Sequence, residues 1–548
     1  MMSEKKRVKG ETLLEIKGLK IEGNSDGVWH PIVKGVDVSL KRGEVLGLIG
    51  ESGAGKSTIG LAAMGFARPG CRISDGTIMF DGIDLRKASE EEKRNLWGSR
   101  IAYVAQSAAA AFNPAHTLID QTVETAVRHN IMTREQAEAD ARDLYKRLQL
   151  PKPDTIGDRY PHQVSGGQLQ RAMTAMAMAC RPDLIIFDEP TTALDVTTQV
   201  EVLAAMRDIV EQFNTAAIYI THDLAVVAQM ADRIMVLLRG KEVEQAPTRE
   251  MLKQPTQDYT KTLWAVRKIA KPEDISSDIV LRVHEVDGSY GGGHKVLDNV
   301  TVQLPRGRTV AVVGESGSGK STLARAITGL LPPTKGEVYF NGKPLPKALK
   351  DRDKDTLRRI QMIYQSADTS LNPRQTIRDL IGRPLQFYHG LSGAARDRGV
   401  VELLDAIELN ESYIDRLPGE LSGGQKQRIS IARALAAKPE IIICDEVTSA
   451  LDQIVQEEIL TLLMKLQKDT NVSYLFITHD IATVRAISDE IVVMHQGKVV
   501  QQGPKSQVLN PPYPAYTELL LSSVPEMDPD WLTNLLTKRA TGKVKARV

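Results

Sequence analysis

Residues 421–452 read LSGGQKQRISIARALAAKPEIIICDEVTSALD, and this stretch decides the fold. It joins the motif SGGQ to an apolar run of strand length that ends in Asp445 and Glu446. These motifs and two others occur twice in the chain, in the same order and at offsets of 257 or 264 residues. Such a recurrence indicates a duplicated domain. The pairs are VSGGQLQR (164–171) and LSGGQKQR (421–428), LIIFDEPTTALD (184–195) and IIICDEVTSALD (441–452), ITHD (220–223 and 477–480), and GLIGESGAGKST (47–58) and AVVGESGSGKST (311–322).

The repeat predicts four segments along the chain. We assign residues 1–265 to the first domain, 266–280 to a linker, 281–525 to the second domain and 526–548 to a C-terminal tail. The linker sequence, VRKIAKPEDISSD at 266–278, is polar, contains a proline and has no apolar periodicity.

Each copy alternates apolar runs of strand length with helical stretches, which is typical of an α/β domain with a largely parallel sheet. Segments 114–150 and 373–412 have helical spacing, so we expect a helical subdomain there. Asn113-Pro114 and Asn372-Pro373 are interpreted as the N-cap and first residue that open it. The strands that we expect are 44–50, 183–189 and 216–223 in the first copy and 308–314, 440–446 and 473–480 in the second.

Composition excludes several classes of protein. Lys and Arg number 70 against 69 Asp and Glu, a net charge of +1, so no overall field attracts nucleic acid or an anionic membrane. The three cysteines lie far apart in the sequence and offer no metal-ligand spacing or disulfide framework. The chain begins with MMSEKKRVKG and no apolar run follows, so we expect no signal peptide and no bilayer-spanning segment. Basic residues near the C-terminus are interpreted as a solvated end: Lys538, Arg539, Lys543, Lys545 and Arg547.

A glycine-rich loop follows the first apolar strand of each copy, in the pattern G-x-x-x-x-G-K-S. Its glycines turn backbone N–H groups toward phosphate oxygens, the lysine adds a full positive charge, and the serine can bind Mg²⁺. We therefore expect ATP and Mg²⁺ at both loops. The predicted residues are Gly50, Ser52, Gly53, Gly55, Lys56, Ser57 and Thr58 in the first copy and Gly314, Ser316, Gly317, Gly319, Lys320, Ser321 and Thr322 in the second.

Two adjacent acids end a later strand in each copy, Asp188-Glu189 and Asp445-Glu446. The aspartate is suited to hold Mg²⁺, and the glutamate to polarise an attacking water. A histidine, His222 or His479, ends a further strand at an equal distance of 34 residues from the aspartate. The equal spacing favours a catalytic role over a structural one.

Taken together, these residues resemble the ABC ATPase family over nearly the whole chain. The resemblance implies a RecA-like α/β core, an antiparallel β subdomain and a helical subdomain in each copy. The most specific motif is SGGQ, which in that family caps a helix facing the γ-phosphate of ATP held by the other domain, with closure of the two domains around ATP. Its residues here are Ser165, Gly166, Gly167 and Gln168, and Ser422, Gly423, Gly424 and Gln425.

The resemblance also implies roles for further residues. Gln106 and Gln365 match the family's Q-loop residue, which senses Mg²⁺ and the transport partner, and Asp195 and Asp452 match its D-loop. Tyr290 lies where the family stacks an aromatic ring on adenine. In the first copy Asp26 lies opposite Tyr290, and Trp29 is the nearest aromatic candidate. Because both copies otherwise contain the full set, we expect two hydrolytic sites.

A finer similarity is to ATPase subunits of oligopeptide, dipeptide and nickel importers, here as a fused pair. It rests on SLNPR (370–374), YPHQVSGGQ (160–168) and NPPYPAYTELLLSSVP (510–525). It implies a peripheral motor on the cytoplasmic face of a bacterial inner membrane, without insertion into the bilayer. Its partners would be two membrane permease subunits, contacted near 107–113 and 366–372, and a solute-binding protein in the assembled complex. Many members have a C-terminal cysteine cluster, but no cysteine follows Cys444, so we predict no iron–sulfur cluster.

Two alternatives stay open on sequence alone. One is a soluble tandem ATPase that acts on ribosomes or nucleic acid, although the segment 266–278 is short and the net charge is near zero. The other is the motor of an exporter. The sequence leaves the cargo open among peptides, opines, nickel chelates and glutathione-like ligands, since specificity belongs to proteins outside this chain.

Overall fold

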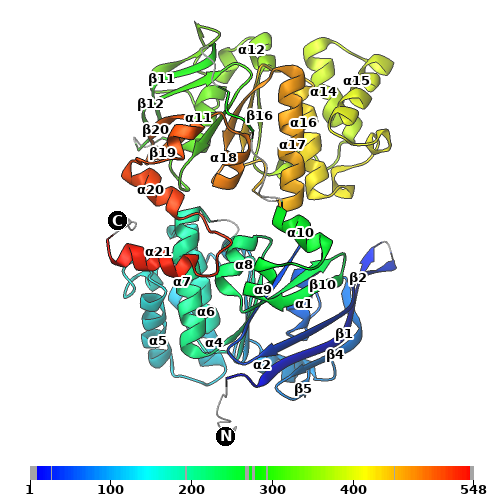
Figure 1. Cartoon of the computed structure of the whole chain (residues 1–548), viewed down its shortest axis with the longest axis vertical. Coiled ribbons are helices and arrows are strands. Elements are labelled where there is room, and N and C mark those ends of the chain that lie inside the picture. The colour runs from blue at the N-terminus through cyan, green and yellow to red at the C-terminus, as the bar shows by residue number, and fades with distance from the viewer. Residues whose placement is uncertain are drawn as a thin grey trace. The chain divides into compact units, whose positions relative to one another are not determined.

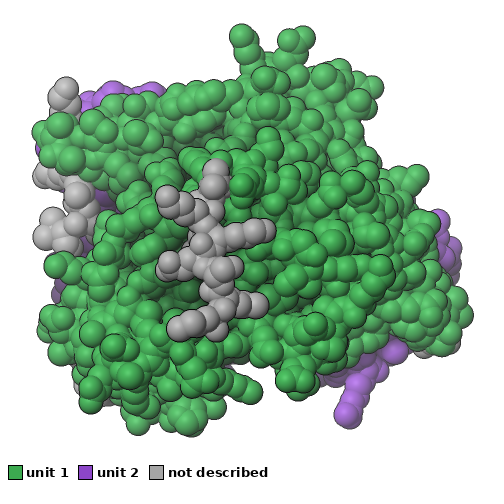
Figure 2. Space-filling model, turned by 90° about the horizontal axis from the view of Figure 1, so that it is seen from below, with its two compact units in different colours: residues 1–265, 525–541 green, residues 266–524, 542–548 purple. Residues whose placement is uncertain are grey.

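The computed structural model describes residues 9–25, 27–191, 194–265, 271–274, 278–291, 294–449 and 451–542. Residues fall into two compact units. Unit 1 comprises residues 1–265 with 525–541, and unit 2 comprises 266–524 with 542–548 (Figure 2). Each unit has the same three parts, described below for each unit by itself.

A six-stranded sheet forms the core of each unit (Figure 1). In unit 1 the strand order is β10-β9-β3-β8-β7-β6, parallel except for the edge strand β10. The strands are β3 (Val45–Gly50), β6 (Ile101–Val104), β7 (Leu184–Asp188), β8 (Ala216–Ile220), β9 (Arg233–Leu238) and β10 (Lys241–Pro247). In unit 2 the order β16-β17-β18-β13-β19-β20 is formed by β13 (Thr309–Val313), β16 (Ile360–Ile363), β17 (Ile441–Asp445), β18 (Ser473–Ile477), β19 (Glu490–His495) and β20 (Lys498–Pro504). Helices cover both faces, so strands such as β3 and β7 are buried along their whole length, as their continuous apolar sequence predicts.

A four-stranded antiparallel sheet packs beside each core. In unit 1, alternate residues of β1, such as Leu14 and Ile16, are buried in one cluster with Leu46 and Leu48 of β3. The strands are β1 (Thr12–Ser25), β2 (Val28–Lys41), β4 (Cys71–Phe80) and β5 (Ile83–Asp84) in unit 1, and β11 (Ile279–Ser289), β12 (Lys295–Pro305), β14 (Lys335–Phe340) and β15 (Lys343–Pro344) in unit 2.

A helical subdomain is inserted between the strands of each core, which confirms the predicted three-part fold. It contains α4 (Leu118–Arg128), α5 (Arg134–Arg147) and α6 (Gly166–Met178) in unit 1, and α14 (Ile377–His389), α15 (Gly393–Ala406) and α16 (Gly423–Leu435) in unit 2.

The interpretation of Asn113-Pro114 and Asn372-Pro373 as the helix start is wrong. α4 and α14 begin later, with Thr117 and Thr376 as their N-caps. The two asparagines instead accept hydrogen bonds from the backbone N–H two residues on, an Asx turn that competes with helix formation.

The remaining helices surround the two cores. Those of unit 1 are α1 (Lys56–Ala62), α2 (Glu90–Leu96), α3 (Ala108–Ala111), α7 (Val196–Phe213), α8 (Leu224–Met230), α9 (Thr248–Lys253), α10 (Asp258–Ala265) and α21 (Trp531–Ala540). Those of unit 2 are α11 (Lys320–Thr328), α12 (Lys354–Arg359), α13 (Ala367–Ser370), α17 (Gln453–Thr470), α18 (Ile481–Ile487), α19 (Lys505–Val508) and α20 (Ala515–Ser522).

The C-terminal helix departs from the order of the chain. Although α21 follows the second domain in sequence, it belongs to unit 1 and lies beside α7 and α8 in Figure 1. Conversely, residues 271–274, within the predicted linker, belong to unit 2, whose first strand begins at Ile279. Residues 266–270 and 275–277 of that linker lie outside the described part, as do Lys543, Lys545 and Arg547 of the basic end.

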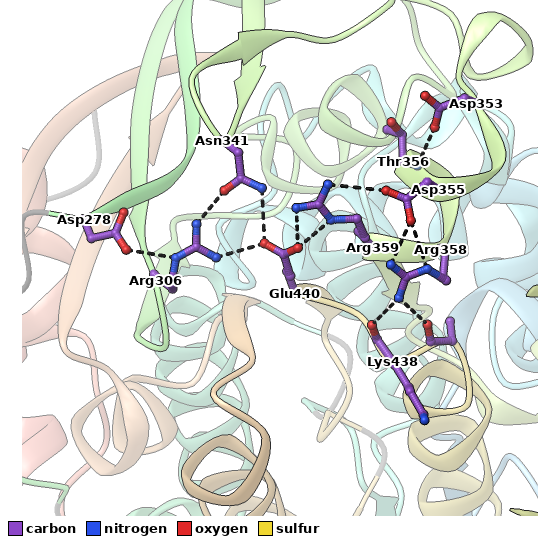
Figure 3. A network of polar contacts seen from close by, with 11 residues as sticks. Asp278, Arg306, Asn341, Asp353, Asp355, Thr356, Arg358, Arg359, Lys438 and Glu440 are labelled. Carbon is purple, nitrogen blue, oxygen red and sulfur yellow. Dashed lines mark hydrogen bonds and ion pairs between the residues drawn. The ribbon is translucent and has the colours of Figure 1, made fainter. Parts of the chain in front are cut away.

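An ionic network joins the antiparallel sheet of unit 2 to the amino end of β17 (Figure 3). Glu440, just before β17, accepts hydrogen bonds from Arg306 at 2.9 Å and Asn341 at 3.2 Å, and pairs with Arg359. In unit 1 Asp183 occupies the equivalent position and pairs with Arg42 and Arg100. Each network therefore stabilises the amino end of the core strand. The repeated acidic motif, Asp188-Glu189 or Asp445-Glu446, lies at the other end of the same strand.

Candidate functional site

The predicted motifs meet at one edge of each core sheet. In unit 1 the glycine-rich loop leaves the carboxyl end of β3, Asp188 ends β7, and His222 follows β8 by two residues. Because β3, β7 and β8 are parallel neighbours, their carboxyl ends lie side by side. Unit 2 repeats the arrangement with β13, β17 and β18. Ligands of open α/β sheets bind at this edge.

The shape of the glycine-rich loop depends on its glycines. Gly50 has φ 146° and Gly55 φ 95°. A side chain on Gly50 would place Cβ 2.1 Å from the carbonyl oxygen of Leu237, so only glycine fits. Gly314 repeats this constraint, with a Cβ only 2.2 Å from the Met494 oxygen. Such a loop, leading into α1 or α11, directs backbone N–H groups toward an anion.

The lysine of each loop is buried against the loop itself. Lys56 Nζ donates to the carbonyl oxygens of Gly50 at 2.7 Å and Glu51 at 2.8 Å. Lys320 Nζ makes the same two bonds, both at 2.8 Å, to Gly314 and Glu315. The positive charge of each lysine is thus held against the backbone of its own loop.

The loop serine contacts the strand-end aspartate in both units. Ser57 Oγ donates to Asp188 Oδ1 at 2.7 Å, and Ser321 Oγ to Asp445 Oδ1 at 3.0 Å. Burial raises the pKa of Asp445, partly offset by the hydrogen bond from Ser321. A hydroxyl and a carboxylate oxygen at this separation form the donor set that Mg²⁺ takes beside nucleotide phosphates. The residues present therefore fit a magnesium ion.

The glutamate after each aspartate is held in a restricted conformation. Glu189 has φ 48° and Glu446 φ 52°, values uncommon outside glycine and frequent at functional sites. Gln106 Nε2 donates to Glu189 Oε2 at 3.0 Å, and His222 Nδ1 lies 3.2 Å from Oε1. Burial alone would lower the pKa of His222, but its contact with Glu189 outweighs burial and raises it.

Unit 2 holds its glutamate with the equivalent residues. Gln365 Nε2 donates to Glu446 Oε2 at 2.8 Å, and His479 Nδ1 lies 3.6 Å from Glu446 Oε1. In both units the glutamate side chain is thus contacted from two sides, by a glutamine and by a histidine.

The SGGQ residues form a capping box at the start of a helix. Ser165 accepts from the Gln168 N–H, and the Gln168 side chain accepts from the Ser165 N–H. Gly167 packs against α7, since a Cβ on it would lie 2.2 Å from Thr198 Cγ2. Asp195 caps α7 by accepting from Thr198, so the motif and the predicted D-loop residue adjoin within one unit.

Unit 2 repeats this group of residues. Ser422 and Gln425 form the capping box of α16, Gly424 packs on Val455, and Asp452 caps α17. Gly166 and Gly423 face neither α7 nor α17 closely, as no atom lies within 3.4 Å of a Cβ built on either. They are the positions where backbone can approach a ligand.

The predicted adenine-stacking positions differ between the units. The Tyr290 hydroxyl lies 3.3 Å from Thr322 Oγ1 of the second loop and accepts from Arg325 at 3.0 Å. In unit 1, Trp29 is stacked under the guanidinium of Arg72, 4.1 Å from the ring centroid. Asp26 lies outside the described residues.

Two tyrosines contact the sites without having been predicted. Tyr103 donates to Asp188 Oδ2 at 2.6 Å from the neighbouring strand β6. The Tyr516 hydroxyl accepts from the backbone N–H of Glu315 in the second loop at 2.9 Å. Tyr103 begins the segment YVAQ that ends at Gln106, so alternation along a strand could have placed it beside β7. Tyr516 lies far from the loop in sequence and has no comparable signal.

The described residues contain no metal-binding group of three or more His, Cys, Asp or Glu side chains. Among the helices that the structure describes, none is both long and apolar enough to span a bilayer.

The sequence is similar to known transport proteins. Residues 33–192 and 297–449 match the family described as ABC transporter, and residues 500–546 match the oligopeptide/dipeptide transporter C-terminal region. The chain is 36% identical over 562 residues to the glutathione import ATP-binding protein GsiA of Salmonella choleraesuis, covering 94% of this chain and 90% of that protein. GsiA of Escherichia coli (strain K12) is 36% identical over 565 residues, with the same coverage. Among solved structures, cbiO1 from Clostridium perfringens, part of an ABC transporter complex, matches with TM-score 0.40 and 30% identity over 42% of this chain and 91% of its own.

Proposed function

The chain belongs to the ABC transporter family, and from this premise we propose that it is the ATP-hydrolysing motor of an importer, with both ATPase domains on one polypeptide. The observation that carries the proposal is the complete catalytic set in both units. Each has a loop lysine, a serine–aspartate pair and a glutamate held by glutamine and histidine.

We propose that the two glutamates are the catalytic bases. The loop lysine and the N-terminus of the following helix bind the β- and γ-phosphates. Ser57 with Asp188, and Ser321 with Asp445, would hold Mg²⁺, whose charge offsets the charge that develops on the transferred phosphoryl group. Glu189 and Glu446 accept the proton of the attacking water, and the adjacent glutamine and histidine keep the carboxylate aimed at it.

The SGGQ caps complete the sites in this proposal. Each cap presents two glycines and the N-terminus of a helix of 13 residues, α6 or α16, and such an end attracts the γ-phosphate. By the family's pattern the cap of one domain serves the nucleotide of the other. ATP binding then favours closure of the two domains, and hydrolysis allows them to open.

Closure would act on two membrane permease subunits. A cavity of about 700 Å³ lies at the start of the helical subdomain of unit 1, within a few residues of Gln106 along the chain. Seven of its nine lining residues have polar or charged side chains, while apolar atoms form the larger part of its exposed surface. The walls are formed by Asn113, His116, Asp120, Gln121, Val123, Glu124, Val127, Arg128 and Arg134. The motor would thus be peripheral, on the cytoplasmic face of a bacterial inner membrane, with a solute-binding protein delivering cargo to the complex.

We infer a peptide or related small solute as the cargo. The support is the match of residues 500–546 to a region of oligopeptide and dipeptide transporters, and the similarity to glutathione importers. Glutathione is a tripeptide, so both comparisons favour peptide-sized solutes with amide and carboxylate groups.

The test is transport and ATP turnover by the complex reconstituted in proteoliposomes. Glu189→Gln with Glu446→Gln should abolish turnover, with a loss of about 100-fold or more, while ATP binding persists. Turnover at the parental rate in this double variant would end the assignment of the bases.

Copurification separates the function classes. We expect tagged chain from membranes to carry integral membrane permeases. Copurification with ribosomes or nucleic acid in their place would favour the soluble alternative, and outward movement of solute in the proteoliposomes would favour an exporter.

A further inference from the structure

The C-terminal segment, residues 525–541, occupies a built site on unit 1. At its centre is Gln229 of α8, whose side chain is only 5% exposed. Its Nε2 donates to the carbonyl oxygens of Glu526 at 2.8 Å and Asp528 at 2.9 Å, and its Oε1 accepts from the Leu532 N–H at 3.0 Å. The buried amide of Gln229 therefore forms hydrogen bonds with three backbone groups of the segment. Without these partners the buried amide would lower the free energy of unfolding.

Charged and apolar contacts extend this site. Arg249 at the start of α9 forms two hydrogen bonds with Asp530, and Arg207 of α7 donates to Thr533 at 3.1 Å. The apolar side of α21, formed by Trp531, Leu532 and Leu535, is buried. The segment is thus bound by orientation-specific polar contacts and by apolar burial together.

A second segment occupies the equivalent face of unit 2. The connecting segment, residues 271–274, follows the first domain in sequence. The Lys271 N–H donates to the Ala486 oxygen of α18 at 2.8 Å, and its Nζ pairs with Asp489 at 2.6 Å. Glu273 accepts from the N–H of Ser506 in α19 at 2.6 Å and from its hydroxyl at 3.1 Å.

The two faces correspond residue by residue. At the offset of 257 residues that relates the later motifs, Gln229 aligns with Ala486 and Arg249 with Ser506. The same offset aligns Lys271-Pro272-Glu273-Asp274 with Asp528-Pro529-Asp530-Trp531. The carboxylate after the proline therefore binds the start of the equivalent helix in both units, α19 through Glu273 and α9 through Asp530.

We propose that these are reciprocal binding sites, each receiving the segment that follows the other domain. The face of unit 1 formed by α7, α8 and α9 is the site for the C-terminal segment of the second domain. The face formed by α18 and α19 of unit 2 is the site for the connecting segment. The chain thus passes from unit 1 to unit 2 after residue 265 and returns to unit 1 after residue 524, and this return leads into the docked helix α21.

The consequence is an attachment that does not depend on ATP. None of the contacts named above involves the phosphate loops, Gln106, Gln365, the proposed catalytic acids or the SGGQ caps. The C-terminal segment therefore keeps the two domains associated when no nucleotide is bound. This inference is independent of the cargo and of the direction of transport.

The experiment separates the docked helix from the covalent connection. A site for a specific protease is introduced at residues 266–270 of the full-length chain, and the cut protein is run on size exclusion without nucleotide. We expect the two fragments to elute together. Gln229→Ala and Arg249→Asp should each shift at least half of the protein to separate fragments, and Arg249→Asp with Asp530→Arg should restore joint elution.

Lys20→Asp, at an exposed ion pair with Asp75 elsewhere in unit 1, is the matched control and should elute like the parent. Separation of the parental fragments without nucleotide would overturn the proposal. Amide exchange of the uncut chain is the second measurement. Arg249→Asp should speed exchange in 531–540 at least tenfold and leave the β3 amides unchanged. Equal exchange of α21 in parent and variant would also overturn it.

Discussion

Because of Tyr103, the two strand-end aspartates, Asp188 and Asp445, differ in the hydrogen bonds that they accept. Its hydroxyl donates to Asp188 in addition to Ser57, whereas Met362 occupies the same position on β16 and offers no donor to Asp445. Burial, and then the bond to Asp188, raise the pKa of Tyr103 well above its usual range. The raised pKa favours the neutral hydroxyl, which is the form that donates to Asp188. When Ser57 turns toward a metal ion, Tyr103 still holds the carboxylate.

We predict that Tyr103→Phe weakens the use of Mg²⁺ at the first site. Loss of a hydrogen bond to a charged group costs about 1.5 kcal/mol, roughly tenfold in an equilibrium constant. The Mg²⁺ concentration for half-maximal ATP binding should rise by about that factor. The measurement uses a fluorescent ATP analogue in a Lys320→Ala background, which disables the second site. Met362→Leu is the matched control, and an unchanged Mg²⁺ dependence of Tyr103→Phe would contradict the prediction.

His479 and Glu446 shift each other's pKa in opposite directions. Burial alone would lower the pKa of His479, but the nearby carboxylate outweighs it and the His479 pKa lies above its usual value. Burial alone would raise the pKa of Glu446, but the contact with His479 outweighs it and the Glu446 pKa lies below its usual value. The pair is therefore ionised over a wider pH range than either group alone.

This pair predicts a pH window for stability. Its full contribution is present between the unfolded-state values, about 4.3 for the carboxyl and about 6.5 for the imidazole. It is lost as pH rises through the raised pKa of His479 and as pH falls through the lowered pKa of Glu446. His479→Gln should lower the Tm of its unit by roughly 2–4 °C at about pH 5.5, and the difference should shrink at about pH 9. Thermal unfolding measures this difference, with His284→Gln at an exposed position of β11 as the control. A Tm difference that grows with pH would contradict the prediction.

Among the helices, α6 begins with two glycines, Gly166 and Gly167, whose surroundings differ. Gly166 has open space at its Cβ position, whereas a Cβ on Gly167 would meet Thr198 of α7 at 2.2 Å. Of these two glycines, only Gly167 is required for the close packing of α6 on α7. Gly166 is free to serve the approach of a phosphate.

We predict that Gly167→Ala lowers the stability of the protein, whereas Gly166→Ala lowers its ATP turnover. Gly167→Ala should lower the free energy of unfolding by about 1–3 kcal/mol, because it overpacks the contact with α7. Gly166→Ala should leave stability unchanged or raise it by about 0.5 kcal/mol, because alanine favours the helix, while it reduces ATP turnover. Denaturant unfolding and phosphate release are the two measurements. A stable Gly167→Ala variant with an unstable Gly166→Ala variant would reverse the assignment.

Elements that the sequence predicts well are those whose signal is local. Runs such as LIIFD form buried strands because no polar residue interrupts them, and G-x-x-x-x-G-K-S forms its loop because the glycine conformations leave few alternatives. The start of α4 was misjudged because Asn113 and Thr117 both suit an N-cap, and only the Asx turn at Asn113 excludes it. Tyr516 was missed because its contact with Glu315 depends on tertiary packing across about 200 residues, which no local pattern encodes.

In the whole molecule, both units contain every residue of the proposed catalytic set, but the residues around that set differ between the units. Unit 1 has Tyr103 beside its strand-end aspartate, where unit 2 has Met362. At the predicted adenine-stacking position, unit 1 has Trp29 stacked under Arg72, and unit 2 has Tyr290 beside Thr322. The sequence does not predict that the C-terminal segment binds unit 1. Domain boundaries drawn along the chain assign each segment to the domain that it follows. The repeat of a proline followed by an acid, Pro272-Glu273 and Pro529-Asp530, was the available signal.

Paired substitutions identify which SGGQ cap completes which phosphate loop. If ATP on the Lys56 loop is completed by the Ser422 cap, then Lys56→Ala and Ser422→Arg disable the same site, and the pair should keep about the turnover of Lys56→Ala alone. Lys56→Ala with Ser165→Arg disables both sites, and its turnover should fall to the background rate. The measurement is steady-state phosphate release by the assembled complex. The reciprocal controls are Lys320→Ala with Ser165→Arg, which should disable one site, and Lys320→Ala with Ser422→Arg, which should disable both. If each cap served the loop of its own domain, the two pairs would exchange their activities, because the lysine and the cap act on one nucleotide and their losses are not additive.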